Sequence, residues 1–170
     1  MAEYVRHLRD LVGGEELLQI PSVSIALRDA AGRVLLARHV EGDVWLLPGG
    51  AIEPAEVPAD AAVREMFEET GLVVQITSLV GVFGGPEFVV RYRNGHRTSY
   101  VMAVFEAELS SGSPHPDATE VLEVRLVKEA EAEALPLARW LPEVLQAVFH
   151  GQRTQAFRRP TWQPLPDDRL

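Results

Sequence analysis

The sequence predicts an α+β or mixed α/β sandwich, in which helices cover a mixed β-sheet. Segments rich in β-branched and apolar residues come first, are interrupted by one clear amphipathic helix at 58–70, and then resume. A second helical segment follows at 138–149, and no internal repeat divides the chain. The 170 residues lie in the usual size range of one domain and suffice to bury a core.

The elements before the clear helix start with a short helix and continue as strands. Residues 2–12 are predicted to form an amphipathic helix. Its apolar side is formed by Tyr4, Leu8 and Leu11. Residues 22–29 are expected to form a strand that turns into a partner strand at 33–39, and a short strand follows within 45–54 before proline and two glycines break it.

Residues 58–70 carry the strongest helix signals in the chain. Pro58 suits the first turn of a helix, and Gly71 suits the left-handed residue just past its end. On a helical wheel, one face is expected to pack on the core. This face holds Ala59, Val63, Met66, Phe67 and Thr70.

The second half of the chain is predicted to be mostly extended. Residues 72–83 form a long strand candidate, and 88–93 and 96–109 are expected to pair as a hairpin. Asn94-Gly95 between them favours a tight type I′ turn, which needs two positive φ angles. Residues 120–127 are a further strand. We divide the chain into an N-terminal helix with its lead-in at 1–19, a main domain at 20–150, and an extended or disordered C-terminal arm at 151–170.

Composition excludes several classes of protein. The chain has no cysteine, which excludes disulfides, zinc–thiolate sites and cysteine nucleophiles. A formal net charge of -9 argues against a protein that wraps duplex nucleic acid. No stretch approaches the roughly 18 apolar residues that a membrane helix needs, and the N-terminus lacks the apolar region of a secretory signal. A cytoplasmic location is therefore expected.

Three carboxylates of the helix at 58–70 form the main candidate site. Glu65, Glu68 and Glu69 lie at positions i, i+3 and i+4, so they are expected to project from one face, opposite the apolar stripe. Like charges at this spacing repel by about 0.2–0.5 kcal/mol per pair, and a hard divalent cation with oxygen ligands reverses that repulsion. The alternative interpretation is a solvated acidic face without a ligand.

The surroundings of these glutamates favour the metal site. Glu56 lies just ahead of the helix and adds a fourth carboxylate. Arg64 lies beside Glu65 and four residues before Glu68, where a guanidinium can orient a carboxylate. Pro48-Gly49-Gly50 is expected to bring bare backbone close to the helix, so that a glycine carbonyl completes the coordination.

The pattern from Gly50 onward resembles a complete Nudix box, the signature of the MutT-related pyrophosphohydrolases. It runs from Gly50 over five residues to Glu56 and over seven more to Arg64, and ends with the sequence REMFEETGL, so that the box covers residues 50–72. The chain is similar to Nudix hydrolases over residues 20–150, which implies their α/β/α sandwich. Ala55 and Val57 replace the family's frequent glycine and serine or threonine. These replacements concern the local turn and the helix cap and leave the metal site intact.

The resemblance also implies roles for individual residues. Glu65, Glu68 and Glu69 are expected to bind Mg²⁺ (Mn²⁺ is the alternative), helped by the carbonyl of Gly49. Arg64 is expected to orient Glu65. Glu56 is expected to support the loop or to bind metal through water. The implied reaction is attack of Mg²⁺-activated water on one phosphorus of a diphosphate bridge in a small nucleotide-type substrate.

The residue that removes the proton from the attacking water remains open. Family members use either a glutamate of the box or a glutamate from a later loop, and Glu120 is our candidate for the later one; its alternative is an exposed residue at a strand edge. The five histidines show no metal-ligand spacing and are expected at surface or turn positions.

Several functions fit the same pattern. The main prediction is hydrolysis of a nucleoside diphosphate linked to another moiety, such as ADP-ribose. A nucleoside triphosphate pyrophosphohydrolase of the house-cleaning type is the first alternative, and a non-catalytic nucleotide-sensing module is the second. Isopentenyl diphosphate isomerisation on the same fold uses a catalytic cysteine, which this chain lacks. We expect no nucleic-acid and no membrane partner, and a homodimer is possible because many relatives are dimers.

Overall fold

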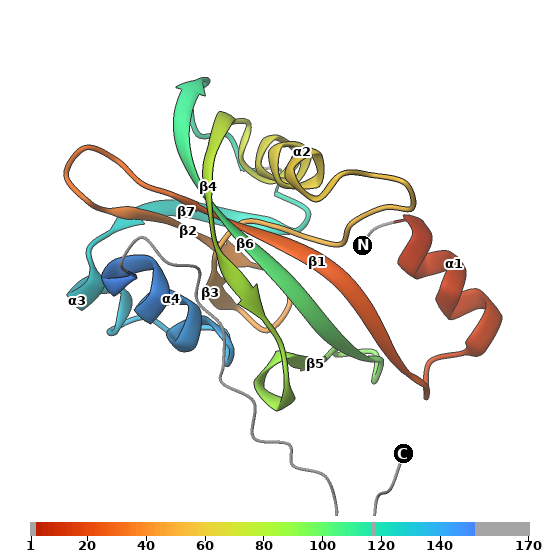
Figure 1. Ribbon diagram of the computed structural model, residues 1–170. Coiled ribbons are helices and arrows are strands. Elements are labelled where there is room, and N and C mark those ends of the chain that lie inside the picture. Colours follow the sequence, from red (N-terminus) through yellow and green to blue (C-terminus); the bar gives the residue numbers. More distant parts are fainter. Residues whose placement is uncertain (1–2, 117, 152–170) are drawn as a thin grey trace, which may run out of the picture.

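The computed structural model describes residues 3–116 and 118–151 of the chain, so that the predicted C-terminal arm beyond Gly151 lies outside the described residues (Figure 1). The structure contains helices together with parallel and antiparallel strands, which confirms the predicted fold class. Within the described ranges, no helix is long and apolar enough to cross a membrane. The elements are α1 (Glu3–Val12), β1 (Leu17–Leu27), β2 (Val34–His39), β3 (Val44–Leu46), α2 (Pro58–Thr70), β4 (Val73–Phe83), the 3-10 helix η1 (Pro86–Phe88), β5 (Val89–Arg91), β6 (Arg97–Ser111), β7 (Val121–Val127), α3 (Glu129–Ala132) and α4 (Leu141–His150).

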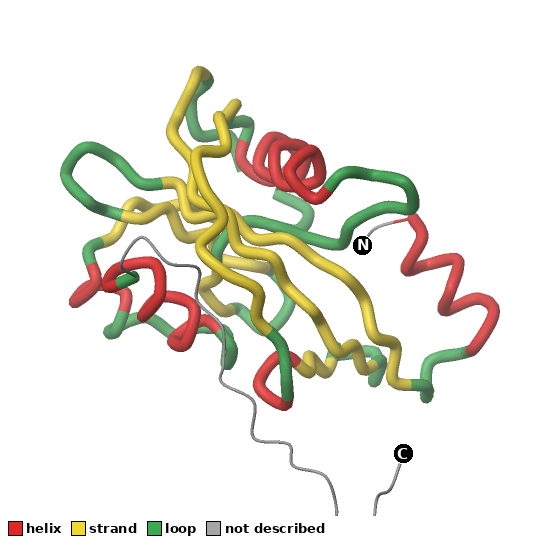
Figure 2. Tube along the Cα trace, in the orientation of Figure 1, coloured by secondary structure: helices red, strands yellow, loops and turns green. Residues whose placement is uncertain are grey.

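The β layer consists of two sheets (Figure 2). In the first, β1 and β4 flank β6, and β5 also pairs with β6. Strands β1 and β6 run parallel, with Leu17 opposite Arg97 and Leu27 opposite Ala107, whereas β4 and β5 are antiparallel to β6. In the second sheet, β2 lies between β3 and β7 and is antiparallel to both.

The expected hairpin between residues 22–29 and 33–39 was wrong. The chain does turn at Asp29, whose N–H donates to the Arg33 carbonyl at 3.0 Å, but β1 and β2 then enter different sheets. A single isolated bridge joins Arg28 to Val34. The reason is visible in burial: residues 22–27 are all buried, so β1 is enclosed on both faces and cannot remain in an isolated two-stranded ribbon.

The later hairpin between β5 and β6 is confirmed, but its turn differs from the prediction. Val89 lies opposite Ser99, and the Tyr92 N–H donates to the His96 carbonyl at 2.9 Å. Of the two turn residues, only Gly95 has a positive φ, at 88°. A type I′ turn needs two positive φ angles. The turn is therefore closed by one left-handed glycine, and Asn94 does not adopt the strained conformation.

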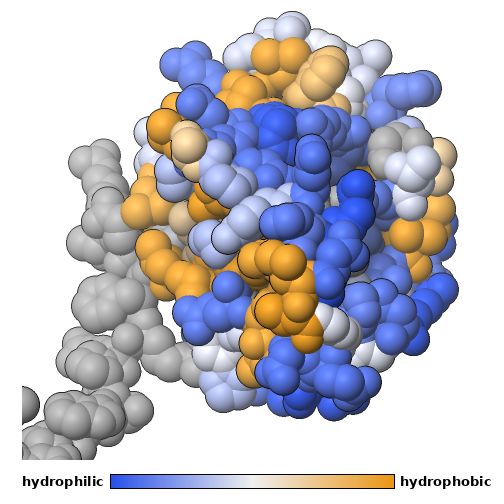
Figure 3. All heavy atoms as spheres, turned by 90° about the vertical axis from the view of Figure 1, so that its right-hand side faces the viewer, coloured by the Kyte–Doolittle hydropathy of each residue, from blue (hydrophilic) through white to orange (hydrophobic). Residues whose placement is uncertain are grey.

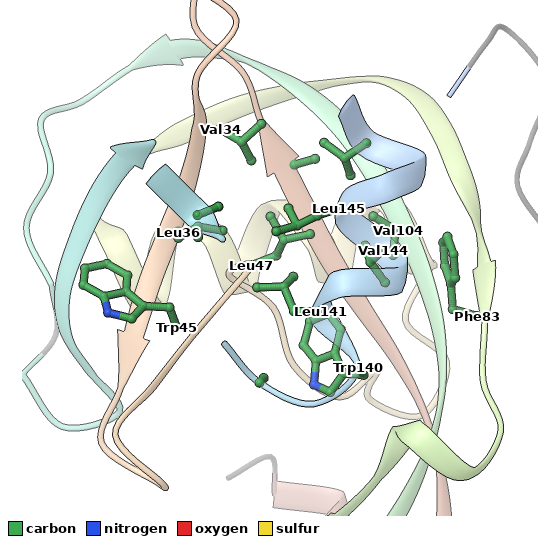
Figure 4. Close-up of a cluster of buried hydrophobic side chains, with 14 of the residues drawn as sticks. Val34, Leu36, Trp45, Leu47, Phe83, Val104, Trp140, Leu141, Val144 and Leu145 are labelled. Carbon is green, nitrogen blue, oxygen red and sulfur yellow. The ribbon is translucent and has the colours of Figure 1, made fainter. Parts of the chain in front are cut away.

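Two hydrophobic clusters pack on opposite faces of the β layer. Strand β2 shows the alternation: Val34 and Leu36 belong to the cluster under α4, and Leu35 to the cluster under α2. Figure 4 shows the α4 cluster, in which Leu141 and Val144 point toward the strands. Helices α2 and α4 thus cover the two faces, which gives the α/β/α layering expected from the resemblance (Figure 1).

Helix α1 packs beside the sheet through a face that the sequence pattern identified only in part. Val5 is buried against Ile20 and Ala51, and Leu8 packs against the same cluster as predicted. Tyr4 and Leu11, which were expected on the same apolar side as Leu8, are exposed. Figure 3 views the molecule from the side on which α1 lies, where hydrophilic groups cover most of the surface and hydrophobic groups form separate clusters.

A buried arginine fastens α1 to the sheet. The Arg9 guanidinium donates to the carbonyls of Gly13 at 3.4 Å, Glu16 at 2.7 Å and Arg97 at 2.5 Å, and to the Thr98 hydroxyl at 3.2 Å. These bonds give the buried guanidinium the hydrogen-bond partners that a polar group needs inside a protein. The hydrogen bonds of Arg9 therefore help to determine which face of α1 turns inward, and a helical wheel based on hydrophobicity does not predict them.

Candidate functional site

Helix α2 begins and ends at the predicted residues. Gly71 has φ 72°, and its N–H donates to the Phe67 carbonyl at 2.8 Å, a left-handed helix end that glycine adopts without strain. The two departures from the family pattern both have a local consequence. Ala55 has φ 66°, which is strained for a residue with a Cβ, and Val57 occupies the helix N-cap without a side-chain hydrogen bond.

The predicted separation of an apolar face and an acidic face of α2 was wrong in part. Phe67, assigned to the core side, is exposed, whereas Glu69, assigned to the acidic side, is buried beside Met66 and Thr70. The three box carboxylates are consequently not equivalent. The side chain of Glu65 is 12% exposed and that of Glu68 is 58% exposed. Glu65 and Glu69 turn inward, whereas Glu68 lies at the protein surface.

A glycine turn receives the two inward carboxylates. The Pro48 and Gly50 carbonyls accept hydrogen bonds from the N–H groups of Ile25 and Val23, both at 2.9 Å, which fixes the turn along β1. The Gly49 N–H donates to Glu69 Oε2 at 3.0 Å.

A Cβ would meet close neighbours at both glycine positions. A Cβ on Gly49, whose φ is 151°, would lie 2.2 Å from the Val23 carbonyl oxygen. A Cβ on Gly50 would lie 2.5 Å from the Glu65 carboxyl group. Bare backbone thus approaches the helix as the sequence predicted, because a larger residue would displace either β1 or Glu65.

Arg64 holds three carboxylates around itself, as an orienting residue should. Its Nε and Nη2 donate to the two oxygens of Glu56 at 2.8 and 2.9 Å, a bidentate pair. Its Nη1 donates to Glu65 at 2.8 Å and to Glu68 at 3.1 Å, and Nη2 also reaches the Ala51 carbonyl at 3.2 Å. One guanidinium therefore fixes the loop before α2 and the acidic face of α2 relative to each other.

The two carboxylates nearest Arg64 have pKa values shifted in opposite directions. The hydrogen bonds from Arg64 hold the pKa of Glu56 below its usual value. Burial raises the pKa of Glu65, and the repulsion of Glu68 and Glu120 adds to this effect, which Arg64 opposes only in part. The charged form of Glu65 is thus only partly compensated by the protein.

Glu120 joins the box from a distant part of the chain. A carboxylate oxygen of Glu120, one of Glu69 and a ring nitrogen of His39 all lie within 4.8 Å of one another. His39 was expected at a surface or turn position, and that expectation was wrong. Its Nδ1 accepts a hydrogen bond from the Glu41 N–H at 3.2 Å, which leaves the proton of the neutral ring on Nε2.

A β-bulge explains why the sequence did not predict His39 near the carboxylates. Arg38 pairs with Glu123 on β7, but the next residue, His39, pairs with Val121, so that Leu122 is the extra residue. Such a bulge bends a strand and redirects a side chain. A register shift depends on the partner strand, and no periodicity within β2 signals it.

A cavity of about 800 Å³ opens between these groups and the first sheet. Glu65, Glu69 and Glu120 line one part of it, and apolar side chains line another. The apolar part includes Val44, Leu46, Met102 and Trp140. A cavity of this size, apolar on one side and polar at a few convergent positions, is typical of a small-molecule site.

Aromatic and basic side chains divide between cavity and core. Tyr92 lines the cavity, as do Arg91 and Arg93 of the hairpin turn. Phe88 is buried and stacks on Trp140 with ring centroids 6.0 Å apart. Trp45 is buried as well, and the guanidinium of Arg125 lies over its ring.

A family model described as the NUDIX domain matches residues 18–148. An RNA pyrophosphohydrolase from Pseudomonas savastanoi pv. phaseolicola is 50% identical over 52 residues, which are 31% of this chain and 33% of that protein. The chain thus spans about a third of the length of the curated relatives that it matches.

Solved structures share the fold. A NUDIX hydrolase from Nitrosomonas europaea matches with a TM-score of 0.65 and 26% identity, over 84% of this chain and 78% of that one. An ADP-ribose pyrophosphatase from Streptococcus suis matches with a TM-score of 0.60 and 20% identity, over 82% of this chain and 96% of that one. The arrangement of α2, the glycine turn and the two sheets is therefore built on a known scaffold.

Proposed function

Because this chain belongs to the Nudix family, we propose that it is a divalent-metal-dependent pyrophosphohydrolase that cleaves the diphosphate bond of a nucleoside diphosphate linked to another moiety, as in ADP-ribose. The observation that carries the proposal is the convergence of Glu65 and Glu69 on the Gly49-Gly50 turn, with a carboxylate oxygen of Glu120 within 4.8 Å of one of Glu69. The name of the Streptococcus suis structure supports this substrate class.

The residues present fit Mg²⁺ or Mn²⁺. Five carboxylates and one guanidinium leave a formal excess of four negative charges around one small volume; the acidic members are Glu56, Glu65, Glu68, Glu69 and Glu120. Oxygen donors dominate the set, which is what Mg²⁺ requires. The raised pKa of Glu65 also supports a cation at this position, since a nearby positive charge would favour the charged form of this carboxylate. Glu65, Glu68, Glu69 and the Gly49 carbonyl are the proposed ligands.

The chain's own residues then have distinct tasks. Arg64 keeps Glu65 and Glu68 in place, and Glu56 anchors Arg64 from the loop. Glu120 is our candidate general base, a carboxylate that accepts the proton of the attacking water at one of its oxygens; a box glutamate is the alternative. Mg²⁺, when bound, lowers the pKa of water and neutralises charge on the bridging and leaving oxygens.

The test is a substrate screen with product identification. Purified protein with Mg²⁺ or Mn²⁺ is incubated with nucleoside diphosphate esters, nucleoside triphosphates and a 5′-triphosphate RNA oligonucleotide, and products are followed by phosphorus NMR. We expect a nucleoside monophosphate and the phosphorylated second moiety. EDTA should abolish their formation. Binding of nucleotide without any product would support a sensing module instead.

Two isosteric variants test the assignment of the carboxylates. Glu68→Gln and Glu69→Gln should each lower kcat by at least about 100-fold, the order of loss expected when metal coordination is disturbed. Folding should change little, because Glu68 lies at the protein surface and a glutamine at 69 still offers the Gly49 N–H an acceptor. Glu108→Gln, at an exposed position on β6, is the matched control. Wild-type rates in either box variant at saturating Mg²⁺ would contradict the proposal.

A second candidate function is hydrolysis of a nucleoside triphosphate. Arg91 and Arg93 line the cavity at the hairpin turn, where a cation can bind a terminal phosphate. Arg91→Gln with Arg93→Gln should then raise KM for a triphosphate far more than for a diphosphate ester. The substrate screen above measures both.

A further inference from the structure

The imidazole of His39 lies among the carboxylates but has no part in the proposed metal site. A ring nitrogen of His39, an oxygen of Glu69 and an oxygen of Glu120 lie within 4.8 Å of one another, and all three residues line the cavity. Glu69 is buried, and the other two are half-buried. Two carboxylates this close repel each other more strongly here than in water. A hydrogen-bond donor beside them favours their charged forms.

The hydrogen bond at Nδ1 determines what His39 offers to the carboxylates. Nδ1 accepts the Glu41 N–H at 3.2 Å, so that Nδ1 carries a lone pair and the ring proton lies on Nε2. A histidine that binds a metal through Nε2 has its proton on Nδ1 and donates it to a carbonyl, a carboxylate or water. The Glu41 N–H cannot accept such a proton. His39 is therefore set up as a hydrogen-bond donor through Nε2 and not as a ligand of a cation.

Backbone hydrogen bonds hold the segments of His39 and Glu120 together. The Val40 N–H donates to the Glu120 carbonyl at 2.9 Å, so the residue after His39 is tied to the backbone of Glu120. The Ala118 N–H donates to the Val121 carbonyl at 3.0 Å and closes the turn that carries Glu120. Ala118 has φ 61°, a conformation that residues other than glycine rarely adopt. The ring and the carboxylate thus lie on segments fixed relative to each other, as a preorganised site requires.

We propose that His39 is a positioning residue for hydrolysis, whose Nε2–H donates to Glu120 and holds that carboxylate toward the attacking water. The proposal rests on the proposed function, in which Glu120 is the candidate general base. A base must lie within hydrogen-bond reach of the proton that it removes. A donor at one oxygen of Glu120 fixes the direction of the other, which takes the proton of the water. His39 acts through Glu120 rather than on the substrate or the cation.

Two substitutions separate the two nitrogens of the ring. His39→Asn keeps an acceptor for the Glu41 N–H but loses the distal donor, whereas His39→Gln keeps a donor as many bonds from Cβ as Nε2. With ADP-ribose and Mg²⁺, His39→Asn should lower kcat by about 10–100-fold with KM within about twofold of the wild type, the loss typical of a missing supporting hydrogen bond. His39→Gln should recover most of the rate, and no recovery would contradict the donor role. The control, His7→Asn at an exposed position on α1, should change neither constant.

A double-mutant cycle tests whether His39 acts through Glu120. Glu120→Gln removes the candidate base and should lower kcat by about 10²–10⁴-fold. In that background, His39→Asn should lower kcat further by less than about twofold, because a positioning residue has no effect once the group that it positions is lost. A role in general stability would instead cost the same factor in both backgrounds. Equal losses in the two backgrounds, or a wild-type kcat in His39→Asn, would overturn the proposal.

Nitrogen NMR of the histidine rings separates this proposal from the proposed function, because it needs no turnover. In EDTA, the signals of His39, assigned by their loss in His39→Asn, should show a protonated Nε2 and an unprotonated Nδ1. The same tautomer should persist when Mg²⁺ is added. Loss of the Nε2 proton on addition of Mg²⁺ would identify His39 as a metal ligand and overturn its positioning role alone. A wild type with the expected tautomer that hydrolyses no substrate of the screen would contradict the proposed function and, with it, the positioning role.

Discussion

Replacing Arg64 by methionine should destabilise the metal-free protein strongly. The side chain of Arg64 is 29% exposed, and those of its partners Glu56 and Glu65 are 17% and 12% exposed. Removing one member of a buried ion pair costs about 3–5 kcal/mol, since the remaining charge loses its compensation. Because the ion pairs are partly exposed, we expect a loss near the lower end of this range, at about 3 kcal/mol. This loss is a large fraction of the free energy of unfolding of a typical domain, which is roughly 5–15 kcal/mol.

Urea denaturation in EDTA measures the effect, with the fluorescence of buried Trp45 and Trp140 as the signal. A loss of 3 kcal/mol at a slope of about 2 kcal/mol/M lowers the midpoint by roughly 1.5 M. The control is Arg33→Met, which breaks a 2.7 Å pair with Asp29. The side chain of Arg33 is 43% exposed, so this loss should cost less than about 1 kcal/mol. Equal midpoints for the two variants would refute the role of Arg64 as the centre of the site.

Further predictions concern the helix cap, the glycine turn, the core and pH. Val57→Ser should stabilise the protein by about 1 kcal/mol in urea denaturation, because serine supplies the missing N-cap bond at an exposed position. Gly49→Ala should destabilise it by about 3 kcal/mol or prevent folding, since its Cβ would meet the Val23 carbonyl; circular dichroism melting checks this. Leu36→Ala, in the α4 cluster, should cost about 2–5 kcal/mol. The raised pKa of Glu65 means that stability in EDTA should fall as pH rises through the folded pKa, above the unfolded value near 4.5; Glu65→Gln should lack this fall, and identical pH profiles would contradict the shift.

The sequence predicted α2 and the carboxylates on it because both depend on local patterns. Proline at the first turn, glycine at the end and a spacing of three and four residues fix the helix and the neighbouring positions of Glu65, Glu68 and Glu69. The same local logic misassigned Phe67 and Glu69. A wheel ranks residues by polarity, and Glu69 is buried because the Gly49 N–H, 20 residues away, supplies a partner for its carboxylate.

Features that depend on distant partners were not predictable from the pattern. The partner of β1 is β6, some 80 residues later, so the hairpin assignment failed. Residues 22–27 and 34–39 are extended as predicted, but β1 already begins at Leu17, within the segment assigned to the N-terminal lead-in. His39 reaches the carboxylates through a bulge opposite β7. Arg9 faces inward because three carbonyls and one hydroxyl receive it, which hydrophobic periodicity cannot register.

The central claim is that Glu65, Glu68 and Glu69, with the Gly49 carbonyl, hold a divalent cation beside the Gly49-Gly50 turn, next to the cavity. Crystals soaked with Mn²⁺ and a non-hydrolysable diphosphate analogue test it most directly, through the anomalous signal of the metal. The account predicts a peak at about 2.0–2.3 Å from oxygens of at least two of these carboxylates, in contact with the diphosphate. Peaks confined to other surfaces, with the analogue bound and these carboxylates pointing away from it, would contradict the account.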